Sequence, residues 1–246
     1  GFRVLSLSQN VGKVVINFDP ETEIDVLPLP KDKARGIHGD GTYLITGGFS
    51  GLGLVTARKL VDLGARHLAL VGRRGLDTPG APEAIAALRE SGGAVESYNL
   101  DISDETAVSE LFVDLAARMP PLAGIFHSAG VLDDGLMTGQ TPERMMRVMA
   151  PKALGIRHLD TCSRQLALDH FVVFSSISAI VGNAGQAGYA AANAVADAVM
   201  QQRRALGLPG LSINLGPVSD IGMAASNPAV VAHFDNLGLY SITPDE

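Results

Sequence analysis

Four polar side chains have the types and spacing that proton transfer to a carbonyl oxygen requires. Ser176 lies 13 positions before Tyr189, and Asn193 follows Tyr189 by four positions. Residues four apart share one face of a helix, so Tyr189 and Asn193 are expected to lie together. A tyrosine can donate its proton when a nearby cation lowers its pKa from about 10, and Lys152 is the candidate cation. The group indicates reduction of a ketone, with hydride supplied by a cofactor.

A glycine-rich string, Thr46–Gly53, joins an apolar strand to a helix-forming segment. Glycine permits a tight turn there and lets the backbone approach a pyrophosphate at the helix N-terminus. The alternative is an ordinary tight turn. The spacing is G-x-x-x-G-x-G rather than G-x-G-x-x-G, and it is similar to that of short-chain reductases. The predicted cofactor contacts in this loop are Gly47, Gly48, Phe49, Ser50, Gly51, Leu52 and Gly53.

Polar residues follow the second and third expected strands, where a doubly wound fold meets an adenosine group. Arg73 and Arg74 come after the second strand. Arginine there accommodates the 2′-phosphate of NADP, whereas an acidic residue binds the 2′-hydroxyl of NAD. The alternative is a pair of solvated surface arginines. Asp101 and Ile102 end the third strand, where Asp101 either borders the adenine or caps the next helix. The expected cofactor is therefore NADPH.

The segments that must position these residues alternate between strand and helix patterns from residue 41 onward. Strands are expected at Thr42–Thr46, His67–Val71, Val95–Leu100, Leu122–His127, Phe171–Ser175 and Leu211–Leu215. Helices are expected at Leu52–Leu63, Pro82–Ser91, from Ser103 or Asp104 to Arg118, from about Thr141 onward, and at Tyr189–Leu206. This alternation implies right-handed crossovers, with helices on both faces. The predicted fold class is α/β, a doubly wound parallel sheet of the Rossmann type.

The composition excludes several functional classes. The chain has 246 residues, of which 46% are hydrophobic, 18% are charged and 28 are glycine. The net charge of −7 argues against a nucleic-acid partner, and no apolar run reaches the length of about 20 residues that a membrane span needs. One cysteine excludes a disulfide framework, and no metal site is expected. The start, which has no Met and no signal-peptide pattern, predicts a cytoplasmic segment of a longer protein.

Residues 1–40 differ from the rest. Arg3–Leu7 and Lys13–Phe18 are expected to be two short strands, and Asp19–Asp40 is rich in proline and charge, which favours a linker. The alternative is a ragged edge hairpin of the same domain. We therefore expect a domain boundary near residue 40, with the main domain at 41–246.

Several longer strings resemble one family. From Gly41 to about Ala225 the chain resembles the catalytic half of a polyketide synthase ketoreductase domain, a branch of the short-chain dehydrogenase/reductase family. The matching strings are Thr46–Gly53, His127–Asp134, Phe174–Ser176, Gly188–Asn193 and Asn214–Pro217. Most short-chain reductases carry Tyr-x-x-x-Lys, whereas here Asn193 takes the lysine position and the lysine is Lys152. That interchange resembles the synthase ketoreductases.

The resemblance implies a role for each matching residue. Tyr189 would be the general acid, and Ser176 would hydrogen-bond the substrate carbonyl. Lys152 would bind the nicotinamide ribose and lower the pKa of Tyr189, and Asn193 would hold the geometry and a proton-relay water. Further cofactor contacts would come from Ser128, Ala129, Gly130, Pro217 and Val218. Val218 stands where the family often has Trp, which leaves the shape of the substrate-side wall open.

The resemblance also bears on stereochemistry. The triplet Leu132, Asp133 and Asp134 resembles the fingerprint of ketoreductases that give a D-β-hydroxyl, and the chain has no Trp, which the competing class carries before its tyrosine. The alternative is that the two aspartates form an exposed acidic loop. Ala191, where reductases that act on epimerised substrates have Pro, favours an unsubstituted or unepimerised substrate. The remaining substrate-side residues are Gln186 and Met223, and the segment after Gly222 is expected to form a lid.

The implied partners follow from the same family. The substrate would be a β-ketoacyl group on the phosphopantetheine of an acyl carrier protein. Residues 1–40 resemble the tail of an enoylreductase domain, which implies a fully reducing synthase with a structural ketoreductase half upstream and a dehydratase step afterwards. Two alternatives stay open: the ketoreductase of a fatty-acid synthase, and a non-catalytic structural reductase fold.

Overall fold

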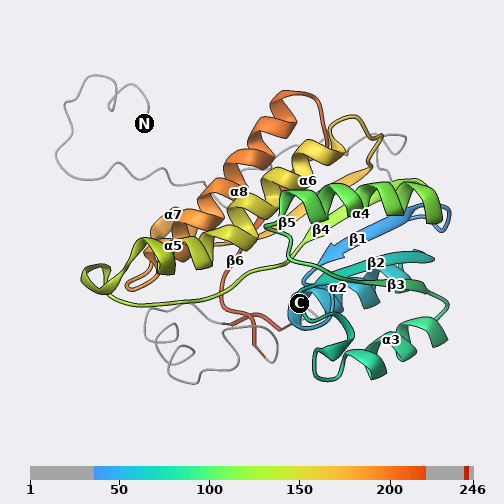
Figure 1. Cartoon of the computed structure of the whole chain (residues 1–246), viewed down its shortest axis with the longest axis horizontal. Coiled ribbons are helices and arrows are strands. Elements are labelled where there is room, and N and C mark those ends of the chain that lie inside the picture. Colours follow the sequence, from blue (N-terminus) through green and yellow to red (C-terminus); the bar gives the residue numbers. More distant parts are fainter. Residues whose placement is uncertain (1–35, 220–240, 244–246) are drawn as a thin grey trace, which may run out of the picture. The chain divides into compact units, whose positions relative to one another are not determined.

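The computed structural model describes residues 36–219 and 241–243 (Figure 1). At its centre is a parallel sheet of six strands in the order β3-β2-β1-β4-β5-β6. The strands are β1 (Thr42–Thr46), β2 (His67–Gly72), β3 (Ala94–Asn99), β4 (Leu122–His127), β5 (His170–Ser176) and β6 (Leu211–Leu215). The direction of strand succession reverses between β1 and β4, and such a switch point is where doubly wound folds bind ligands.

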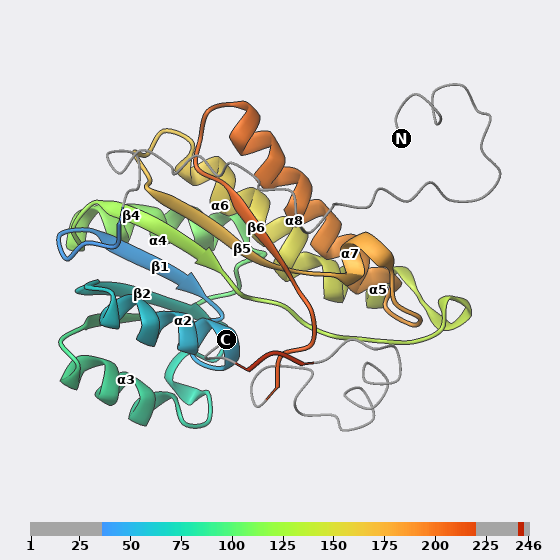
Figure 2. The same ribbon diagram turned by 180° about the vertical axis from the view of Figure 1, so that it is seen from behind.

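Helices cover both faces of this sheet. The α-helices are α2 (Gly51–Asp62), α3 (Ala81–Glu90), α4 (Glu105–Arg118), α5 (Pro142–Met149), α6 (Gly155–Ser163), α7 (Ser178–Val181) and α8 (Ala187–Ala205). Short 3-10 turns occur at η2 (Gly75–Asp77) and η3 (Met137–Gly139), and η4 (Ala150–Leu154) is a π-helical turn. Figure 1 is seen from the side of α4, α6 and α8, and Figure 2 brings α2 and α3 to the front.

Two hydrophobic cores follow from the alternation of side chains along the strands. Tyr43 and Ile45 of β1 point to the α2 and α3 side, where Leu60 and Ile85 pack against them. Leu44 lies on the opposite face, in the core that α4, α6 and α8 complete. Both faces of the inner strands are therefore apolar, as a parallel sheet between two helix layers requires.

The predicted doubly wound sheet is confirmed, and each of the six strands predicted from Thr42 onward has both ends within one residue of its observed bounds. Asp104, one of two predicted caps, accepts a hydrogen bond from the Ala107 N–H at 3.0 Å and begins α4. Thr141 caps α5 in the same way. The helix expected from Thr141 onward is interrupted by η4. The π-helical turn η4 contains Pro151, which has no backbone N–H to donate to a regular helical hydrogen bond.

Three sequence predictions fall outside the described residues: the strands at Arg3–Leu7 and Lys13–Phe18, and the lid after Gly222. The division between two compact units of the chain falls between Arg35 and Gly36, five residues before the predicted domain boundary. The origin of residues 1–40 stays a prediction. Within the described part of the chain, no helix has the length and apolar character needed to cross a bilayer.

Candidate active site

A cavity of about 860 Å³ lies where β1, β2, β3 and β4 end. Its lining comes from the loops that follow these strands, so residues distant in sequence meet at the switch point. The predicted cofactor residues that line it are Gly47, Phe49, Ser50, Gly51, Leu52, Arg73, Arg74, Asp101, Ile102, Ser128, Ala129 and Gly130. Most of the residues that line this cavity were therefore predicted from the sequence as cofactor contacts.

The glycine loop has a geometry that side chains would disrupt. Gly47 has a φ of +67°, in the left-handed region that favours glycine. A Cβ on Gly53 would lie 2.2 Å from the Gly47 carbonyl oxygen, so the first turn of α2 packs directly on the loop backbone. The N-terminus of α2 consequently lies at the cavity, where its dipole favours negative charge. A dinucleotide phosphate fits this cradle.

The arginines and Asp101 line the part of the cavity that follows β2 and β3. Arg73 and Arg74 are exposed and line it directly after β2. Asp101 also lines it, and its Oδ1 accepts hydrogen bonds from the Ser103 N–H at 2.9 Å and the Ser103 hydroxyl at 2.7 Å. The helix cap is Asp104, so Asp101 shapes the turn before α4 without being that cap.

Tyr189 and Ser176 come together from different elements. Tyr189 lies in the first turn of α8, and Ser176 is the last residue of β5. Burial raises the pKa of Tyr189, and hydrogen bonds with the side chains of Asn193 and Ser176 oppose that rise. The net direction is upward, so the hydroxyl holds its proton at neutral pH. The lowering by Lys152 that the resemblance implies stays a prediction for the cofactor-bound protein.

Lys152 lies in the π-helical turn η4, and its side chain is 3% exposed. Its Nζ donates a hydrogen bond to the Phe174 carbonyl, two residues before Ser176 on β5. Burial lowers the pKa of Lys152 to about 8, and the negative charge of Asp197 opposes that fall. The turn therefore places a buried cation at the strand that carries Ser176.

Asn193 provides a buried acceptor. It is fully buried, and its Nδ2 donates to the Tyr189 carbonyl oxygen at 2.9 Å within α8. Its Oδ1 is buried and has no hydrogen-bond partner among the residues that the structure describes. A buried amide oxygen of this kind calls for a donor, and a water or a ligand hydroxyl can supply one. This observation fits a cofactor or relay water beside Tyr189.

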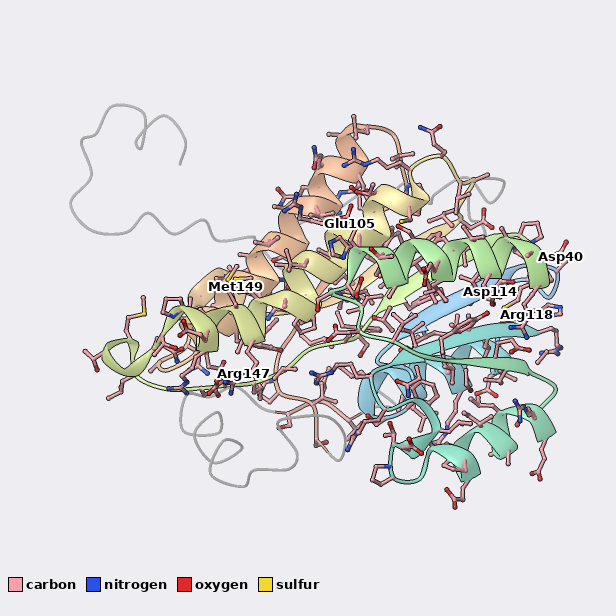
Figure 3. The ribbon with its side chains drawn as sticks, in the orientation of Figure 1. Asp40, Glu105, Asp114, Arg118, Arg147 and Met149 are labelled. Carbon is pink, nitrogen blue, oxygen red and sulfur yellow. The ribbon has the colours of Figure 1, made fainter. Side chains whose placement is uncertain are left out.

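Both aspartates of the acidic triplet have side-chain partners, although Asp134 is exposed. Asp133 forms ion pairs with two arginines of α5, Arg144 at 2.5 Å and Arg147 at 3.2 Å. Figure 3 labels Arg147 on this helix. Asp134 accepts a hydrogen bond from Gln186 Nε2 at 2.9 Å, which ties the loop to the residues just before α8. The structure thus joins two of the predicted substrate-side residues, Asp134 and Gln186.

The remaining predicted positions lie apart from the cavity lining. Gly48 packs beneath the loop, Pro217 and Val218 are buried after β6, and Leu132 is partly buried. Met223 lies outside the described residues. Three residues near the site were not among the predicted ones. A Cβ on Gly72 would lie 2.8 Å from Phe49 Cδ2, Asn214 bonds the Ser176 carbonyl, and Asp197 bonds Asn214. Asn214 belongs to the string Asn214–Pro217 that resembles the family, but its distance along the sequence from Asp197 gives no sign that the two residues are in contact.

Comparisons with known proteins identify the family of this chain. Residues 41–220 match the model of the KR domain family. Polyketide synthase GfsB of Streptomyces halstedii is 47% identical over 77% of this chain and 3% of its own length. The spectinabilin polyketide synthase system protein NorB of Streptomyces orinoci is 39% identical over 97% of this chain and 10% of its own. The chain thus spans a small part of these relatives.

Solved structures of ketoreductases are also similar to this chain. The structure of A-type ketoreductases from a modular polyketide synthase is 38% identical, with a TM-score of 0.81 over 89% of this chain and 46% of that chain. A short chain dehydrogenase from Burkholderia cenocepacia in complex with NADP is 21% identical, with a TM-score of 0.73 over 84% of this chain and 86% of that chain, and supports the fold alone. The chain therefore belongs to the KR domain family, the polyketide synthase ketoreductases of the short-chain dehydrogenase/reductase fold.

Proposed function

We propose that this domain reduces a β-ketoacyl thioester to a β-hydroxyacyl thioester with NADPH. The observation that carries the proposal is the meeting of Ser176, Tyr189 and Asn193, with the buried Lys152 bonded to the same strand, at the C-terminal edge of the sheet that also carries the glycine cradle after β1. The cradle, Arg73 and Arg74 would hold the dinucleotide, and its 2′-phosphate suits the two arginines. When bound, NADPH supplies the hydride that the reduction needs.

The side chains account for the other half of the reaction. Ser176 donates a hydrogen bond to the substrate carbonyl oxygen, and Tyr189 transfers its phenolic proton to that oxygen as the carbon gains hydride. The raised pKa of Tyr189 keeps this proton in place until charge develops on the oxygen. Lys152 supplies the positive charge that stabilises the resulting phenolate, and Asn193 Oδ1 accepts from the water that reprotonates it.

The stereochemical proposal rests on the acidic triplet. Asp133 is paired with Arg144 of α5 and Asp134 with Gln186 just before α8, so both aspartates after Leu132 have side-chain partners. We propose a D-β-hydroxyl product on an α-unsubstituted or unepimerised substrate. Chiral analysis of a reduced diketide thioester tests this part, and a predominantly L alcohol would contradict it.

The cellular setting is proposed from the relatives. They are large polyketide synthases, so we propose that this domain works beside other synthase domains in the cytoplasm. The acyl chain would arrive on the phosphopantetheine of an acyl carrier protein. The proposed neighbours are a structural ketoreductase half, a dehydratase and an enoylreductase, whose tail would be residues 1–40.

The deciding experiment measures NADPH consumption with acetoacetyl N-acetylcysteamine, a small β-ketoacyl thioester. Tyr189→Phe removes the proton donor and keeps the ring, so we expect kcat to fall on the order of 100-fold or more. The wild-type domain should prefer NADPH to NADH because of Arg73 and Arg74.

The matched control is Tyr98→Phe. Tyr98 donates a hydrogen bond to Asp114 at 2.8 Å, away from the site. The rate per folded molecule should stay within about twofold of wild type, as for other substitutions outside a catalytic group. Equal rates for Tyr189→Phe and wild type would refute the proposed acid.

A further inference from the structure

A polar network beneath the site centres on Asp197, on the α8 face that also carries Asn193. Asp197 Oδ1 accepts from the Ser212 hydroxyl, and its Oδ2 accepts from Asn214 Nδ2 at 2.8 Å. Both donors belong to β6, next to β5 in the sheet. One carboxylate thus ties α8 to β6, four residues after Asn193 and eight after Tyr189.

The network continues from β6 to the strand that ends in Ser176. Asn214 Nδ2 lies 3.2 Å from the Ser175 hydroxyl oxygen and 3.2 Å from the Ser176 carbonyl oxygen. The Ser175 hydroxyl in turn donates to the Asn193 carbonyl at 3.5 Å. The backbone at Ser176 and the helix that carries Tyr189 therefore share a closed set of contacts through Asp197 and Asn214.

Lys152 lacks a direct counter-ion within this arrangement. In the described ranges, no carboxylate lies within 4.0 Å of its Nζ as a salt bridge. Asp197 is the charge that opposes the burial effect on Lys152. His127 on β4 also faces Lys152, but burial first and the Lys152 charge second lower its pKa to about 3, so it is neutral at pH 7. Tyr189 is neutral there as well.

We propose that Asp197 is a positioning residue for the reduction: through Asn214 it ties the Ser176 backbone to the helix that carries Tyr189, and its negative charge stabilises the Lys152 ammonium at the neighbouring Phe174 carbonyl. This inference rests on the proposed function for its catalytic meaning. It assigns a role to a half-buried carboxylate that touches neither cavity nor substrate. A carboxylate is required because one group must accept from both β6 donors and carry the negative charge.

The test uses the cofactor-free chain, because the Lys152 charge is measurable without turnover. The sequence has five lysines, so ¹³C labelling of lysine side chains gives few NMR signals, and Lys152→Met identifies the one sought. Asp197→Asn should lower the Lys152 titration midpoint, on the order of 0.5 pH, because Asp197 is half-buried and partly screened. The alkaline limb of the kcat–pH profile should shift in the same direction. Asp62→Asn, on the exposed face of α2, removes the same charge and should leave the midpoint unchanged.

A second variant separates charge from position. Asn214→Ala keeps the carboxylate but cuts its link to β5, so kcat should fall about tenfold with little change in KM or in the Lys152 midpoint. An unchanged midpoint in folded Asp197→Asn would overturn the proposal. If that variant does not fold, a kcat within twofold of wild type for Asn214→Ala would overturn it instead. If the wild-type domain is inactive but Asp197→Asn still lowers the Lys152 titration midpoint, the proposed function is contradicted. The effect of the Asp197 charge on Lys152 is then supported all the same.

Discussion

Two buried cations lie at opposite ends of α8, Arg203 within the helix and Lys152 in the neighbouring turn η4, and they are held in different ways. Arg203, near the C-terminal end of the helix, is 1% exposed and lies 2.7 Å from the carboxylate of Asp160. Its guanidinium also stacks on the Phe171 ring at 4.4 Å from the centroid, and it donates to the Pro209 carbonyl. Lys152, near the N-terminal end, is 3% exposed and donates to a backbone carbonyl, with Asp197 acting on it without a direct salt bridge.

The difference separates a structural charge from a functional one. A buried cation that is paired with a carboxylate has its charge committed to that partner. Arg203 is of this kind, although its Nη2 is buried without a hydrogen-bond partner among the described residues. A buried lysine without a direct carboxylate partner is destabilised by desolvation of its charge. Its positive charge can still interact with a ligand or with a developing phenolate. The two ends of α8 therefore predict opposite results when each cation is removed.

The largest effect is expected at the structural end. Arg203→Ala removes the pair with Asp160 and the stacking on Phe171, and should lower the free energy of unfolding by about 3 kcal/mol. Urea unfolding measures this, with Arg204→Ala, an exposed neighbour, as the control that should change stability by less than about 1 kcal/mol. The rate per folded molecule should stay near wild type. Full stability in Arg203→Ala would remove the contrast between the two ends.

An intermediate effect of opposite sign is expected at the functional end. Lys152→Met removes a cation whose folded pKa, about 8, lies below its unfolded value. The burial of the charge costs stability below pH 8, and this cost disappears above the unfolded pKa of about 10.4. The substitution should raise the free energy of unfolding at pH 7 by about 1 to 3 kcal/mol while abolishing reduction. Unfolding at pH 7, where Lys152 is charged, is compared with unfolding at pH 10.5, where its charge is largely lost. A Lys152→Met variant that is less stable than wild type at pH 7 would contradict a destabilising buried charge.

The smallest effect is expected where a cation pairs in solvent. Arg118 on α4 lies 3.3 Å from Asp114 and 3.3 Å from Glu96, and Figure 3 labels Arg118 and Asp114. The side chains of Arg118, Glu96 and Asp114 are 55%, 46% and 38% exposed, so water and salt screen the pairs. Arg118→Ala should change the free energy of unfolding by less than about 1 kcal/mol, and 0.5 M salt should abolish the change. A salt-independent loss of several kcal/mol would show that direct pairing matters more here than burial.

The sequence predicted the fold and the cofactor wall because both depend on local patterns. Strand alternation, the Thr46–Gly53 loop and the Asp104 cap each depend on residues within a few positions of one another. The π-helical turn at Lys152 was not predicted, since a proline within a helical pattern gives no sign of how the turn adjusts. Asp197 was missed for another reason: its partners Ser212 and Asn214 reach it only through the strand order.

Isotope transfer tests the central claim most directly. The domain is incubated with NADPH deuterated at both C4 positions and with acetoacetyl N-acetylcysteamine, and the product is examined by mass spectrometry and NMR. We predict a β-hydroxy thioester that carries one deuterium on its β-carbon, because hydride adds to the carbonyl carbon and Tyr189 delivers only a solvent-exchangeable proton to the oxygen. A thioester recovered unreduced, or an alcohol without deuterium on that carbon, would contradict the account.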